Sequence, residues 1–143
     1  MRYVLDASAL LPVVAKQGRD LLTRIHHDWF AITDLTIYES SNSLWKMSYL
    51  LHQLSLEDAK EILNVIHELV DREIFHLLSV SELELASTLE LAVRLRLTYY
   101  DASYVSAAKQ EDAVLVTQDR ALAEAARELV EVLTAEDFQQ KLG

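Results

Sequence analysis

Short apolar runs alternate with longer amphipathic stretches along most of the chain. The clearest run is Ala-Val-Leu-Val-Thr at residues 113–117, whose apolar centre is typical of a strand buried on both faces. Runs of the same kind predict five strands, at residues 2–6, 30–33, 74–78, 113–117 and 130–133. The first run ends in an acid, Asp6, as expected of a buried strand that stops at the edge of a sheet.

The stretches between these runs carry apolar residues at helical spacing. Together with the cap residues Ser55, Asp119 and Thr134, the spacing predicts a series of helices. They cover residues 8–27, 35–52, 55–72, 81–97, 101–112 and 119–129, and a last helix follows residue 134. Within residues 81–97, the apolar side chains fall on one side of the helix: Leu85, Leu89, Ala92, Val93 and Leu97.

Strands that alternate with helices predict a parallel sheet covered by helices on both faces. The chain has 143 residues, enough for one domain with an ordinary core. It has only 2 Gly and 1 Pro, too few for the many tight turns of an all-β sandwich. We therefore predict an α/β fold. It is a single three-layer α/β/α domain over residues 1–143, with a central parallel sheet of about four to five strands.

Composition and charge exclude several classes of protein. Cys is absent, which rules out a disulfide scaffold, a cysteine nucleophile and a thiolate zinc site. No apolar run approaches the roughly 18 residues of a membrane span, and Asp6 interrupts any N-terminal signal sequence. We therefore expect a soluble, cytoplasmic protein that contacts no membrane. The net charge of −10 argues against broad attraction to nucleic acid, but bound metal could reverse the charge of a single site.

Acidic residues follow the predicted strands at the end where open parallel sheets bind ligands. Asp6 and Asp119 come after the first and the fourth strand. Asp101 opens the helix before the fourth strand, and Glu39 lies near the start of the helix after the second. Four converging carboxylates repel one another strongly unless they are protonated or bind cations. Oxygen ligands without Cys or suitably spaced His favour Mg²⁺ or Mn²⁺ over zinc.

The same acids also have a purely structural explanation. Asp6, Asp101 and Asp119 each precede a helix, where Asp commonly acts as the N-cap. Glu39 could belong to a solvated helix face. The joint arrangement of the four acids, more than any one of them, favours a functional site.

The remaining polar and aromatic residues are weaker candidates. Ser8 and Thr117 could be simple caps or turn formers. The five His show no spacing typical of metal ligands. We expect Trp29, Trp45 and the tyrosines to pack in the core or an interface and not to form a platform for nucleobases.

Four motifs in a fixed order give the strongest functional signal. They are Tyr-Val-Leu-Asp-Ala-Ser at 3–8, Tyr-Glu-Ser-Ser-Asn-Ser-Leu at 38–44, Leu-Thr-Tyr-Tyr-Asp-Ala-Ser-Tyr at 97–104 and Val-Leu-Val-Thr-Gln-Asp-Arg-Ala-Leu at 114–122. Together they resemble the PIN domain, the metal-dependent ribonuclease fold of the VapC toxins in toxin–antitoxin pairs. One departure is Leu97 with Thr98, where the family often has Gly. The family's acidic quartet carries over to Asp6, Glu39, Asp101 and Asp119.

The resemblance implies a metal-dependent endoribonuclease that is the toxin of a toxin–antitoxin pair. RNA would be its substrate and an antitoxin protein its partner, and one or two Mg²⁺ or Mn²⁺ ions would be held by the quartet. Ser8 and Thr117 would support the ligands by hydrogen bonds. Residues 35–72 carry more apolar surface than one sheet face covers, and we expect part of it to bind a second copy of the chain or the antitoxin. A homodimer is therefore also expected. Four basic residues are candidates to hold the RNA phosphates that flank the cleaved bond: Lys46, Arg94, Arg96 and Arg120.

Two other functions remain open from the sequence. One is a PIN fold kept as a non-catalytic binding module, against which the intact quartet argues. The other is a haloacid-dehalogenase-type phosphatase, whose motif needs a second acid at position 8, where this chain has Ser8. The RNA target is not readable from the sequence.

Overall fold

A sheet of five parallel strands forms the centre of the computed structural model, which describes residues 1–24 and 26–142. The strands are β1 (Arg2–Leu5), β2 (Trp29–Thr33), β3 (Phe75–Leu78), β4 (Val114–Val116) and β5 (Val132–Leu133). Their order is β3-β2-β1-β4-β5, and every neighbouring pair is parallel. The predicted α/β fold with a parallel sheet is confirmed.

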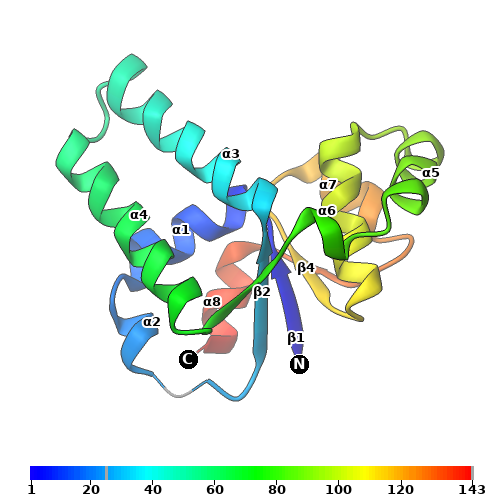
Figure 1. The fold of residues 1–143 in the computed structure, drawn as a ribbon, viewed down its shortest axis with the longest axis horizontal. Helices are drawn as coiled ribbons and strands as arrows, with labels where there is room; N and C mark the ends of the chain where they lie inside the picture. Colours follow the sequence, from blue (N-terminus) through cyan, green and yellow to red (C-terminus); the bar gives the residue numbers. More distant parts are fainter. Residues whose placement is uncertain (25, 143) are drawn as a thin grey trace.

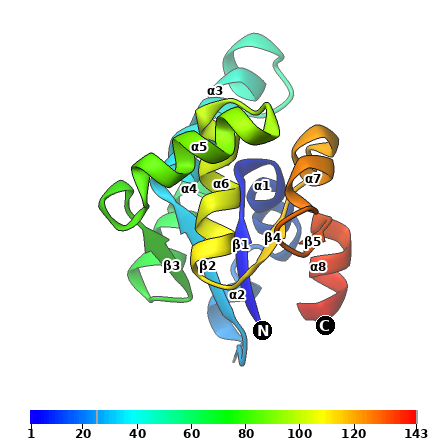
Figure 2. The same ribbon diagram turned by 90° about the vertical axis from the view of Figure 1, so that its right-hand side faces the viewer.

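Helices cover both faces of this sheet, which gives three layers (Figures 1 and 2). The helices are α1 (Ala7–Gln17), α2 (Asp20–Thr23), α3 (Asp34–Trp45), α4 (Leu56–Asp71), α5 (Leu85–Leu95), α6 (Tyr99–Gln110), α7 (Arg120–Ala126) and α8 (Ala135–Leu142). Helices α1, α4 and α8 pack on one face, α6 and α7 pack on the other, and α5 packs against α6. None of the described helices is both long enough and apolar enough to cross a lipid bilayer.

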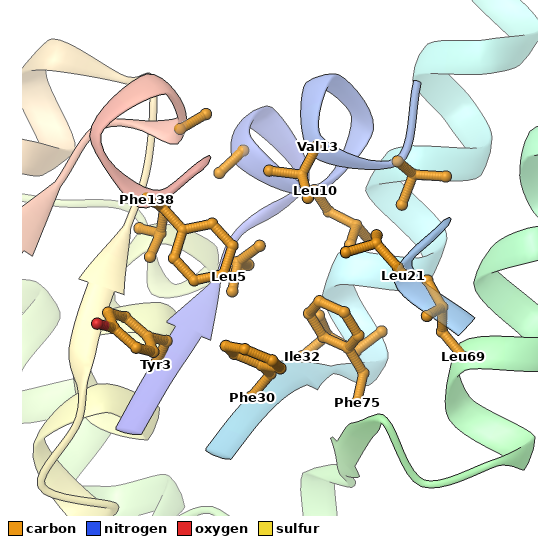
Figure 3. Close-up of a cluster of buried hydrophobic side chains, with 14 of the residues drawn as sticks. Tyr3, Leu5, Leu10, Val13, Leu21, Phe30, Ile32, Leu69, Phe75 and Phe138 are labelled. Carbon is orange, nitrogen blue, oxygen red and sulfur yellow. The ribbon is translucent and has the colours of Figure 1, made fainter. Parts of the chain in front are cut away.

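The two faces of the sheet have separate cores because successive strand side chains point to opposite sides. Figure 3 shows the larger core, in which Phe138 of α8 lies beside Tyr3 and Leu10 of α1 faces the strands. The rings of Tyr3 and Phe138 meet edge to face at 5.0 Å, an arrangement that aromatic pairs favour. On the opposite face, Val4 and Leu115 pack against α6 and α7. This packing fixes α6, and with it the residues that α6 presents at the sheet edge.

Several helix boundaries differ from the prediction. The first helix ends at Gln17, not at residue 27, because Gly18 adopts a φ of 53° and its N–H closes the last turn. Ile25 of that predicted helix and Gly143 of the predicted domain lie outside the described residues. The helix predicted from residue 101 begins two residues earlier, because Thr98 is its cap. The predicted caps are confirmed: Ser55, Asp119 and Thr134.

Residues 81–97 do not form one continuous helix. A short 3-10 turn at Val80–Glu82 comes first, and α5 follows after extended backbone at Leu83. Its buried side is Thr88, Leu91 and Ala92, which pack against small residues of α6. The apolar residues Leu85, Leu89 and Val93 are exposed instead, and we call them the α5 stripe.

The tyrosines, expected in the core or an interface, divide between the core and the surface. Tyr3 and Tyr104 are buried, whereas Tyr38 is 75% exposed and Tyr100 is 64% exposed. Trp45 and Tyr49 are also exposed and stack on each other with ring centroids 5.7 Å apart. They lie at the end of α3 and in the π-helical turn that follows it, Lys46–Leu50. Tyr99 is exposed as well, so four of the six tyrosines belong to the surface, where a partner can reach them.

Candidate active site

The direction of the strand order reverses between β1 and β4. From β1 the sheet extends to β2 and β3 on one side, and to β4 and β5 on the other. In open α/β sheets, this reversal leaves a crevice beyond the carboxyl ends of the strands, where ligands bind. Asp6 directly follows β1, and Thr117 directly follows β4. Both therefore lie at the mouth of this crevice.

Asp6 is buried, with 4% of its surface exposed, and is held by three hydrogen bonds. It is the N-cap of α1, and its Oδ1 accepts from the Ala9 N–H at 3.0 Å and from the Ser8 hydroxyl at 2.7 Å. Its Oδ2 accepts from the Thr117 hydroxyl across the β1–β4 boundary. Burial raises the pKa of Asp6, although the bonds from Thr117 and Ser8 favour the charged form. A carboxylate in this position gains from a nearby cation.

Ser8 and Thr117 also connect Asp6 to the segment that carries Asp119. The Ser8 hydroxyl accepts from the Gln118 N–H at 2.8 Å, and the Thr117 hydroxyl accepts from the Asp119 N–H at 3.1 Å. Asp119 then caps α7, because its Oδ1 accepts from the Leu122 N–H at 3.1 Å. Two hydroxyls thus fix the spacing between two of the four acids.

Glu39 lies on α3, which the sheet holds in place through Thr36. The Thr36 hydroxyl donates to the carbonyl of Leu5 at 3.3 Å, and Thr33 and Thr36 form a reciprocal cap at the start of the helix. The carboxylate of Glu39 accepts from the hydroxyl of Tyr104 at 2.5 Å. Burial, followed by this contact with Glu39, raises the pKa of Tyr104, so the phenol remains a donor.

Tyr104 is a residue of the site that the sequence interpretation treated as core. Its ring is in the core as expected, but its hydroxyl orients Glu39. The signal that could have indicated this role is its position three residues after Asp101, which places both on one side of α6 at the sheet edge.

Asp101 lies in the first turn of α6, after the Thr98 cap, and is partly buried. Burial raises the pKa of Asp101, and the negative charges of Asp119 and Glu39 raise it further. The charge of Glu39 also raises the pKa of Asp6. Each of the four predicted acids is thus coupled electrostatically to at least one other: Glu39 to Asp6 and Asp101, and Asp101 to Asp119.

The described residues supply no positive side chain to neutralise these acids. None of the ion pairs formed within residues 1–24 and 26–142 includes any of the four. In the same part of the chain, no three acidic or His side chains are close enough to form a ready-made metal cage. An oxygen-only donor set that repels itself fits a hard divalent cation, and Mg²⁺ keeps several waters, which suits loosely spaced ligands.

The four predicted phosphate contacts have different surroundings. Lys46, Arg96 and Arg120 are exposed, and Arg120 directly follows Asp119. Arg94 lines a separate hollow between α5 and α6, together with Glu84, Glu90 and Lys109, and none of the four acids lines that hollow. Of these four candidates, Arg120 alone is next to a site acid in the sequence.

Comparisons with known proteins agree with this geometry. Residues 3–128 match the PIN domain family. The chain is 34% identical to the exonuclease VapC9 of Pyrobaculum aerophilum over 134 residues, which cover 94% of this chain and 92% of the relative. It is 33% identical to the ribonuclease VapC3 of the same organism over 129 residues, which cover 87% and 94%.

Solved structures show the same fold. A crystal structure of a Pyrobaculum aerophilum protein superposes with a TM-score of 0.78 at 31% identity, over 99% of this chain and 89% of that one. VapBC-1 from nontypeable Haemophilus influenzae gives a TM-score of 0.63 at 14% identity, over 95% and 99%. The second likeness is one of fold alone. From the matched residues and the identity to its relatives, this chain belongs to the PIN domain family.

Proposed function

We propose that this protein is a metal-dependent endoribonuclease and the toxin of a toxin–antitoxin pair, acting in the cytoplasm with residues 1–143 as one unit. The observation that carries the proposal is the cluster of four mutually repelling acids at the β1–β4 crevice, which has no ion-pair partner among the described residues. Family membership supports a nuclease, and two relatives are named as an exonuclease and a ribonuclease. Membership of the PIN domain family also excludes the alternative of a haloacid-dehalogenase-type phosphatase.

The four acids would hold one or two Mg²⁺ or Mn²⁺ ions. We assign Asp6, Asp101 and Asp119 to direct coordination, and Glu39 to a second ion or to the attacking water. When bound, such ions lower the pKa of water and stabilise charge on the leaving oxygen of a phosphodiester. Four carboxylates carry a charge of about −4, which two divalent ions balance.

The chain's own contribution is to hold these oxygens in place before RNA arrives. Ser8 and Thr117 fix both oxygens of Asp6, so its orientation does not depend on the ion. Tyr104 donates to one oxygen of Glu39 and leaves the other free to accept a proton from water. Preorganisation of this kind reduces the rearrangement needed during the reaction.

A circular single-stranded RNA tests the proposal, because it has no ends and only an endonuclease cleaves it. We expect cleavage with Mg²⁺ or Mn²⁺ and none with a chelator. Glu39→Gln should cleave far more slowly, whereas Glu57→Gln, on the exposed side of α4, should match the wild type. Cleavage of linear RNA alone would make the protein an exonuclease. No cleavage of either RNA would make it a binding module.

The antitoxin, we propose, docks on a groove between α3 and α4, two helices that project together from the body of the molecule (Figure 1). The groove has a volume of about 440 Å³ and an almost wholly apolar lining that includes Leu44, Trp45, Tyr49, Leu56 and Leu63. Solved structures with this fold include VapBC complexes. We also propose that the chain forms a homodimer.

Measuring the mass of the assembly in solution, with and without the protein encoded by the neighbouring gene, tests both the antitoxin and the homodimer. Trp45→Ala should weaken antitoxin binding about tenfold or more, because exposed Trp side chains are frequent binding hot spots. A monomer at high micromolar concentration that stays unchanged after the partner is added would contradict both proposals.

A further inference from the structure

A small apolar hollow lies where α3 and α6 begin, the two helices that carry Glu39 and Asp101. It has a volume of about 230 Å³, and its wall is almost entirely carbon. Three tyrosines line it, and two of them, Tyr38 and Tyr100, immediately precede Glu39 and Asp101 in the sequence. The lining also includes residues from the end of β2, the start of α3, the end of β3, the 3-10 turn and the start of α5. We call this hollow the tyrosine pocket.

We propose that the tyrosine pocket binds one unpaired nucleobase of the RNA, stacked against Tyr38 and Tyr100. This inference rests on the proposed ribonuclease function, because it names the part of the substrate next to the cleaved bond. Aromatic side chains beside a nuclease centre offer flat faces to bases, and any base can stack on them. The volume suits a single ring system better than a helix of a protein partner.

Charge is the main argument for a base as the occupant. The chain has a net charge of −10, so even with two divalent ions balancing the four acids it offers RNA phosphates little general attraction. Within residues 1–24 and 26–142, no Lys or Arg lines the tyrosine pocket, and the one charged residue that does, Asp34, already accepts the Val80 N–H at 2.9 Å. Affinity for RNA must therefore include a contribution that does not depend on charge. Stacking of an uncharged base supplies one.

Local hydrogen bonds fix the wall of the tyrosine pocket. The hydroxyl of Tyr99 donates to the carbonyl of Leu85 at 3.2 Å, which ties the start of α6 to the start of α5. The hydroxyl of Ser103 donates to the carbonyl of Tyr100 at 2.6 Å. The polar atoms of the wall are thus largely occupied, and what is left for a ligand is aromatic and aliphatic surface. We therefore expect recognition by stacking, with little preference among bases.

The test uses a short single-stranded RNA with one cleavage site and the same RNA with an abasic residue beside that site. For the wild type, loss of the base should weaken binding about tenfold. Tyr38→Ala with Tyr100→Ala should raise KM for the intact RNA by a similar factor, leave kcat nearly unchanged and remove the penalty for the abasic RNA. Both side chains are more than half exposed, so the double variant should fold.

The control is Leu89→Ala. Leu89 is an exposed apolar residue of the α5 stripe that does not line the tyrosine pocket, so its loss should not change KM. Equal binding of intact and abasic RNA by the wild type would overturn the inference, and so would an unchanged KM in the double variant. A fall in oligomeric mass in the double variant would also overturn it, because the tyrosines would then seat a second copy of the chain. Binding is measured without cleavage, so an inactive wild type would refute the proposed function and still decide this inference.

Discussion

The acidic site has two halves that are built differently, one around Asp6 at the end of β1 and one around Asp101 at the start of α6. Asp6 is a buried N-cap with three hydrogen bonds, and it joins two neighbouring strands through Thr117. Asp101 is partly exposed on the first turn of a helix, near enough to Asp119 and Glu39 for their negative charges to add to the effect of burial on its pKa. Burial is the largest cause of the raised pKa at both residues, but only Asp6 is part of the framework. The first half of the site is thus built into the fold, and the second is free to adjust around a cation.

The largest expected effect, on cleavage, is common to both halves. Asp6→Asn and Asp101→Asn should each reduce RNA cleavage by more than about 100-fold, because loss of a metal ligand exceeds the effect of losing an outer hydrogen-bond partner. Asp58→Asn is a matched control, since Asp58 occupies the same helix position after its Ser55 cap that Asp101 occupies after Thr98. Cleavage rates at saturating Mg²⁺ provide the measurement. Normal cleavage by either site variant would remove that acid from the active site.

The second largest effect separates the halves by stability. Asp6→Ala should lower the free energy of unfolding by about 2 kcal/mol, because α1 loses its cap and the Thr117 hydroxyl loses its acceptor. Asp101→Ala should leave stability unchanged or raise it, because it relieves repulsion from Asp119 and Glu39. Urea unfolding in the presence of chelator measures both. Equal losses in the two variants would show that the two halves are equally structural.

A smaller effect concerns the link between the halves. Thr117→Val removes the donor to Asp6 and the acceptor for the Asp119 N–H, so cleavage should fall about tenfold with metal affinity reduced in parallel. Thr117→Ser keeps the hydroxyl and should restore most of the activity. If the Val and Ser variants cleave equally, the hydroxyl has no positioning role.

The sequence was sufficient for the parallel sheet and for the placement of the four candidate acids near strand or helix ends, and the reason is local. Apolar runs such as residues 113–117 specify buried strands by themselves, and each acid lies within a few residues of the strand or helix end that positions it. The caps at Ser55 and Asp119 were likewise readable, because a cap contacts only the first turn of its own helix.

What the sequence did not reveal depends on packing between distant segments. α5 has apolar residues on more than one side, and the small residues of α6 decide that Leu91 and Ala92 are buried while Leu89 and Val93 face solvent. The contact between Tyr104 and Glu39 joins residues 65 positions apart. The tyrosine pocket is lined by residues from several elements far apart in the sequence, so no single motif indicates it.

The smallest expected effect tests the open half of the site through pH. A carboxyl whose pKa is higher in the folded chain binds its proton more tightly when folded. Stability therefore falls as pH rises from the carboxyl's pKa in the unfolded chain, about 4, through its raised pKa in the folded chain.

Asp101 has such a raised pKa, and the Asn side chain in Asp101→Asn cannot titrate. In chelator, the free energy of unfolding of Asp101→Asn should therefore rise relative to the wild type between pH 4 and neutrality, by an amount near the ~0.5 kcal/mol of surface substitutions. Asp58→Asn controls for loss of charge in a first helical turn. A difference that stays constant with pH, or that reverses in sign, would mean that the pKa of Asp101 is not raised in the metal-free protein, and the contrast between the two halves would then have to rest on the hydrogen bonds of Asp6.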